Sequence, residues 1–89
     1  MNEMLTKREA ALAILEEVLL AARQAAEKAH EKEANDRFQS GLKTAYYDIL
    51  TVALEQAELF EVNPAEFGMA DFEPDSLLGA PRAAQRQAA

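Results

Sequence analysis

Two apolar stripes with opposing size gradients constrain the fold of this chain more than any other feature. Within each stripe the residues recur at intervals of three and four, which is the period of an α-helix. If the chain folds back near Asn35, the small residues of one stripe meet the large residues of the other. The sequence therefore predicts an all-α fold, a long antiparallel helical hairpin. The first stripe is Leu5, Leu12, Leu15, Leu19, Ala22, Ala26 and Ala29, and the second is Phe38, Leu42, Ala45, Tyr46, Ile49, Val52, Ala53, Leu59 and Phe60.

Polar and capping residues set the limits of the two helices. Thr6 and Glu9 have the spacing of a capping box near the start of helix one, which we expect over about residues 3–32. The polar segment 31–36 then favours a turn, although helix propensity alone also allows a continuous helix through it. Helix two is expected over about residues 36–62. Together they make residues 1–62 the hairpin.

This register makes specific pairs of residues neighbours. It sets Ala29 near Phe38, and it brings Arg8 close to Glu61. Gly41 lies inside helix two, where glycine costs about 1 kcal/mol relative to alanine. We therefore expect a bend or a close backbone contact at Gly41.

A different kind of chain follows the hairpin. Segment 63–68 has the residues of a short capped helical turn. Asn63 is the cap and Pro64 the first helical residue, Glu66 is the capping-box glutamate, and Gly68 ends the turn. We expect residues 63–79 to form this short capped turn and a strap, and residues 80–89 to be a disordered tail. The apolar residues of the strap either cross the open end of the hairpin or are presented to another protein, and we favour packing for the first half. They are Phe67, Met69, Phe72, Leu77 and Leu78.

The small size of the chain predicts self-association. Two helices in a chain of 89 residues bury little apolar surface, and there is no cysteine to supply a covalent link. We expect a homodimer or a higher oligomer, with two hairpins forming a four-helix bundle. Tyr47 and Leu54 lie off the main stripe and suit a second interface. The predicted interface residues are Leu15, Leu19, Ile49, Val52, Tyr47 and Leu54.

Acidic residues dominate the second half of the chain. The net charge is −7, and residues 44–81 contain eight acidic residues but no lysine or arginine. This distribution disfavours nucleic acid, because binding to phosphates depends on lysine and arginine. It suits a basic protein partner, although acidic residues also simply keep an alanine-rich protein soluble. The predicted partner-binding residues are Glu66, Asp71, Glu73 and Asp75.

The sequence holds no motif typical of an enzyme. Its single histidine, His30, has no serine in a nucleophile-elbow context, and three scattered glycines form no phosphate loop. Glu27 and His30 have the Glu-x-x-His spacing of ferritin-like di-iron bundles. However, Gln39 and Ser40 lie opposite them in the predicted hairpin, so this pair is only a weak metal candidate. We expect no cofactor.

The sequence therefore favours a small non-enzymatic interaction or regulatory protein with an acidic face. Two alternatives remain: an antitoxin-like or immunity-like protein that binds a basic partner, and a ferritin-like metal-binding bundle. The longest apolar stretch is too short to span a bilayer, and no basic leader with an apolar run precedes the hairpin. We therefore expect a cytoplasmic protein without membrane contacts.

Overall fold

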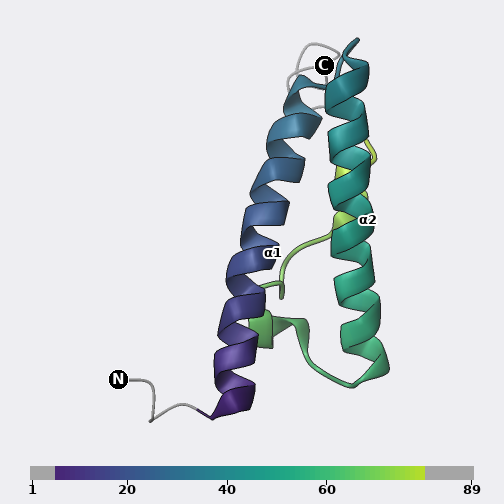
Figure 1. Cartoon of the computed structure of the whole chain (residues 1–89). Coiled ribbons are helices and arrows are strands. Elements are labelled where there is room, and N and C mark those ends of the chain that lie inside the picture. Colours follow the sequence, from purple (N-terminus) through teal and green to yellow (C-terminus); the bar gives the residue numbers. More distant parts are fainter. Residues whose placement is uncertain (1–5, 80–89) are drawn as a thin grey trace.

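The predicted helical hairpin is confirmed. The computed structural model describes residues 6–79, and the only regular elements in that range are helical. Two long helices lie antiparallel and packed together, and two short 3-10 helices follow them on one side of the pair (Figure 1). The predicted residues 3–5 of helix one and the predicted disordered tail 80–89 lie outside the described residues. The elements are α1 (Lys7–Lys32), α2 (Arg37–Leu59), η1 (Pro64–Phe67) and η2 (Pro74–Leu77).

Local signals fix the helix ends. The Thr6 hydroxyl accepts a hydrogen bond from the Glu9 N–H, and the Glu9 carboxylate accepts one from the Thr6 N–H, which is the predicted capping box. At the turn Asn35 has a left-handed backbone with φ of 63°, and the Asp36 carboxylate caps α2 at the Gln39 N–H. A continuous helix is therefore the wrong alternative.

The core uses the predicted stripe of α1 but a different face of α2. Leu19, Ala22, Ala26 and Ala29 of α1 are buried, as the size gradient predicted. In α2 the buried residues are Lys43, Leu50 and Ala57. By contrast, five large members of the predicted α2 stripe are 50% to 70% exposed, namely Phe38, Ile49, Val52, Leu59 and Phe60. The predicted packing of Phe38 on Ala29 is therefore wrong.

The cause of this difference is the segment that follows α2, here called the strap (residues 63–79). It packs on one side of the two helices, where Tyr47 and Leu54 join the core. Covering that side turns Leu50 toward α1 and leaves Ile49 on the opposite side. The strap thus decides which face of α2 is buried.

The strap is anchored as its sequence indicates. Asn63 and Glu66 form the predicted capping box of η1, and Gly68 has a φ of 78°. A Cβ atom on Gly68 would lie 2.9 Å from Cγ of Glu16, so glycine is required there for both conformation and space. We expected packing for the first half of the strap. Its apolar side chains are in fact buried as far as Leu77, whereas Leu78 is 57% exposed. Buried along the strap are Phe67, Met69, Phe72 and Leu77.

Two other observations complete the fold. A Cβ atom built on Gly41 would have no neighbour within 4 Å, so the expected close contact at this glycine is wrong. In residues 6–79, neither long helix has an apolar stretch sufficient to cross a membrane.

Candidate interaction surface

One side of the helix pair carries large apolar side chains that nothing in the described chain covers. This open face lies opposite the strap, toward the viewer in Figure 1. On α1, Ile14 is 66% exposed and Val18 is 57% exposed; both lie away from Glu16, which contacts the strap. The largest side chains of the open face are Ile14, Leu15 and Val18 from α1, Phe38, Ile49 and Val52 from α2, and Phe60 directly after α2.

The area of the open face matches that of a protein interface. Its seven large side chains, at 37% to 70% exposure, leave on the order of 800 Å² accessible, about what one partner buries in a standard-size interface. Monomeric proteins rarely expose an apolar patch this large. The size of the exposed apolar area makes the open face a candidate interaction surface.

The spacing of the open face is that of helices that pack against other helices. Exposed residues on α1 recur at Ala11, Ile14, Val18 and Ala21, in steps of three and four. On α2 the same steps run through residues 38, 42, 45, 49, 52 and 56 without a charged residue. Such uncharged heptad positions are typical of bundle seams. The spacing thus favours a helical partner.

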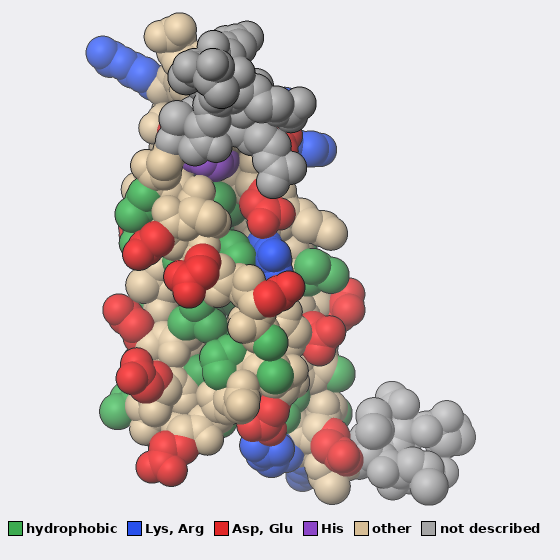
Figure 2. Space-filling view, turned by 180° about the vertical axis from the view of Figure 1, so that it is seen from behind, with side chains coloured by type: hydrophobic (Ala, Val, Ile, Leu, Met, Phe, Trp, Pro, Cys, Tyr) green, Lys and Arg blue, Asp and Glu red, His purple; other side chains and the backbone are tan. Residues whose placement is uncertain are grey.

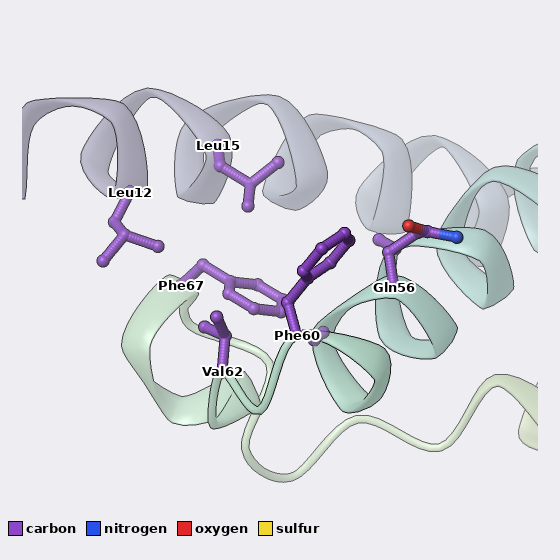
Figure 3. A pocket seen from close by; sticks show the side chains of 8 residues that line it. Leu12, Leu15, Gln56, Phe60, Val62 and Phe67 are labelled. Carbon is purple, nitrogen blue, oxygen red and sulfur yellow. The ribbon is translucent and has the colours of Figure 1, made fainter. Parts of the chain in front are cut away.

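A pocket interrupts the open face at the end distant from the turn. Its volume is about 250 Å³, and its walls come from both helices and the strap (Figure 3). Leu15 and Phe60 project toward each other across it, and Phe67, which is only 1% exposed, lies beneath. Gln56 supplies its single polar side chain. The pocket is lined by Leu12, Leu15, Ala53, Gln56, Ala57, Phe60, Val62 and Phe67.

The predicted interface residues are divided between this surface and the core. Leu15, Ile49 and Val52 lie on the open face, where a second molecule has access to them. Leu19 is 3% exposed and belongs to the core of its own chain. Tyr47 and Leu54 pack against the core on the strap side. Sequence reasoning assigned no interface role to Phe38, Gln56 or Phe60, although the heptad steps on α2 would have grouped the first two with Ile49 and Val52.

The predicted partner-binding carboxylates lie on the other side of the molecule. Figure 2 shows acidic side chains distributed over the face that carries the strap. Glu66 pairs with Arg8 at 2.9 Å, whereas the sequence had placed Arg8 beside Glu61. Asp71 is 88% exposed and lies 3.8 Å from Arg23. Glu73 is exposed as well. The acidic strap thus keeps accessible carboxylates even though α1 supplies two arginines to it.

Two further contacts hold the acidic strap in place. The guanidinium of Arg23 stacks over the ring of Phe72, 4.7 Å from its centroid. The Tyr47 hydroxyl donates to Oδ1 of Asp75 at 3.2 Å. The hydrogen bond from Arg8, helped by the Asn63 N–H, holds the pKa of Glu66 below its ordinary value. These contacts hold the Glu66 and Asp75 carboxylates against the two helices.

A charged cluster closes the turn end of the hairpin. Oε1 of Glu33 lies 3.3 Å from Nζ of Lys43, and Oε2 lies within hydrogen-bond reach of Nδ1 of His30. Lys43 is 9% exposed and His30 is 8% exposed. Burial raises the pKa of Glu33, but the hydrogen bonds and positive charge of His30 and Lys43 outweigh it and lower that pKa. The cluster therefore ties α1 to α2 across the turn.

The two weak metal candidates have separate partners. Glu27 accepts a hydrogen bond from Nε of Arg23 at 3.2 Å, and His30 is paired with Glu33. In the part of the chain from residue 6 to residue 79, no three His, Cys, Asp or Glu side chains come together as a metal site would require. Glu27 and His30 are thus not brought together.

Comparison with known proteins gives no further guide. A scan against protein-family models, a search of curated proteins and a search of solved structures each found no match to this chain.

Proposed function

We propose that this chain is a non-enzymatic protein–protein interaction protein that works as a homodimer. The observation that carries the proposal is the open face, which no residue from 6 to 79 covers: it has about 800 Å² of apolar surface at heptad spacing and no charge along the α2 seam. Pairing two such faces gives a four-helix bundle, the arrangement that satisfies apolar stripes on short hairpins. As the sequence indicates, we place the protein in the cytoplasm.

The acidic strap supports a second binding role within the same proposal. In a bundle formed through the open faces, both straps stay on the outside, so Asp71 and Glu73 remain accessible. Their field favours a basic protein partner and speeds its association. A small acidic protein that neutralises a basic one, as antitoxin-like or immunity-like proteins do, fits this surface. The ferritin-like alternative gains no support from the separate partners of Glu27 and His30.

Self-association is tested with one charge placed on either side of α1. Val18→Glu puts a carboxylate on the open face, whereas Gln24→Glu adds the same charge at an exposed position outside the heptad seam. We expect light scattering to give twice the chain mass of 9.8 kDa for the unchanged protein and for Gln24→Glu. Val18→Glu should shift the assembly to monomers, because burying an unpaired carboxylate costs several kcal/mol. A monomeric unchanged protein at micromolar concentration contradicts the proposal.

The acidic role is tested with amides on the strap. Asp71→Asn and Glu73→Gln remove two exposed charges and keep the shape of the side chains. After affinity capture of a partner, we expect this variant to associate more slowly, with a smaller dependence on salt. The matched control is Glu31→Gln combined with Glu55→Gln, which removes two charges at exposed positions of α1 and α2 outside the strap. Equal association rates for both variants would leave the acidic strap with a solubility role alone.

A further inference from the structure

The arrangement of side chains on the open face also specifies how two copies meet. We propose that the copies pack antiparallel, with Phe38 of each copy filling the apolar pocket of the other. This inference rests on the proposed homodimer and adds its orientation and its anchor residue. The occupant of the pocket is thus a second copy of this chain.

The first argument is the position of Phe38 relative to the pocket. Phe38 is in the first turn of α2, while the pocket borders the last turn at Gln56 and Phe60. The midpoint of α2 is Asp48, so in an antiparallel pair a residue ten positions before the midpoint meets one ten positions after it. Phe38 of one copy then lies level with Glu58 of the other, between Gln56 and Phe60. The antiparallel arrangement therefore brings Phe38 to the pocket.

The second argument is size and polarity. The pocket has a volume of about 250 Å³, and a dry apolar cavity of roughly 150 Å³ is known to admit benzene. It accommodates one phenyl ring. Phe38 is 70% exposed in the single chain, so its ring is available and gains most from burial. An exposed aromatic residue and an aromatic-sized pocket on the same face form a complementary pair.

The third argument is the size pattern of α1. The midpoint of α1 lies between Leu19 and Leu20. In the antiparallel pair Ile14 meets Ala25 of the other copy, and Val18 meets Ala21. Large residues thus face small ones twice on each chain, as a packed helix interface requires. In α2 Val52 likewise falls level with Thr44, next to Ala45.

The parallel arrangement lacks this complementarity. With both turns at the same end, α1 of one copy lies over α2 of the other at the same height. Ile14 and Val18 then meet the Val52 region, large against large, and the small residues of α1 meet Ala45. The two pockets also lie at the end distant from Phe38. Cavities and overpacking both destabilise an interface, so this alternative is disfavoured.

The anchor is tested by removing the ring. Phe38→Ala leaves the core of the single chain intact because Phe38 is exposed, and we expect the dimer dissociation constant to rise at least about 100-fold, as for hot-spot residues. The matched control is Leu78→Ala, which removes a similarly exposed apolar side chain at the end of η2. Analytical ultracentrifugation measures both constants, and circular dichroism verifies that each variant is folded.

The orientation is tested with single cysteines, since the chain contains none. Ile49→Cys places a thiol one residue from the midpoint of α2, and we expect oxidation to link two antiparallel copies there. Ala34→Cys places a thiol in the exposed turn and leaves the Phe38 ring in place. It should not link to itself, because the two turns lie at opposite ends of an antiparallel bundle. Linkage of Ala34→Cys but not of Ile49→Cys, or a Phe38→Ala dimer as tight as the Leu78→Ala dimer, overturns this inference and leaves the homodimer standing. A chain that is monomeric throughout overturns both.

Discussion

Replacing Phe67 by alanine tests whether the strap belongs to the folded core. Phe67 is 1% exposed and lies between α1 and the last turn of α2, so its ring joins the strap to both helices. Truncating a buried phenylalanine costs roughly 3–5 kcal/mol. The lower end applies here because the pocket next to Phe67 is already open, and its walls and water fill part of the new space. We expect a loss of about 3 kcal/mol.

The size of this loss makes it easy to measure. Small domains are stable by only about 5–15 kcal/mol, so the variant loses a large fraction of its free energy of unfolding. With an m-value near 1.5 kcal/mol/M, the urea midpoint falls by about 2 M at equal protein concentration. Detached strap residues should also become susceptible to proteases. Leu78→Ala is the control, since Leu78 is 57% exposed and should shift the midpoint little. Equal midpoints for the two variants would refute the packing of the strap.

Three other predictions concern individual residues. Gly41→Ala should stabilise the chain by about 0.5–1 kcal/mol, because Gly41 is helical and its Cβ has free space, whereas Gly68→Ala should destabilise it, as chemical denaturation will reveal. Leu50→Ala should cost about 2–5 kcal/mol at any protein concentration, while Ile49→Ala should chiefly weaken the dimer measured by ultracentrifugation. The pKa of Glu33 is lowered from its ordinary 4.5. Its contribution to stability is therefore present above about pH 4.5 and is lost as the pH falls through the pKa of the folded state. Glu33→Gln should flatten the acid limb of a curve of stability against pH.

Features that are determined within a few residues could be predicted from the sequence. The capping box at Thr6, the break before Asp36 and the cap at Asn63 each depend on neighbours no more than three positions away. The buried side of α1 could also be predicted, because its leucines and alanines form a single apolar stripe that packs against α2. Capping residues and the helical spacing of apolar residues were sufficient to predict these elements.

The buried face of α2 could not be predicted in the same way. Both Ile49 and Leu50 are large and apolar, and they lie about 100° apart on the helix. Which of them faces α1 depends on the strap, whose contacts with Tyr47 and Leu54 join residues distant in sequence. The burial of Lys43 has a different cause, since its partner Glu33 lies across the turn and not in the strap. The sequence does carry one signal for the buried face of α2. Lys43, Leu50 and Ala57 are seven residues apart, so they lie on the same side of the helix.

The two faces of α2 explain why the most hydrophobic stripe is not the buried one. The core of the single chain combines Leu19 and Leu50 with small residues such as Ala26 and with side chains of the strap. Phe38, Ile49 and Val52 lie outside this core and are exposed on the open face. A chain that acted alone would gain solubility from polar residues at these positions at little cost in stability. Their heptad spacing is the pattern expected for the proposed dimer, in which α2 packs on α1 along one stripe and on a second molecule along the other.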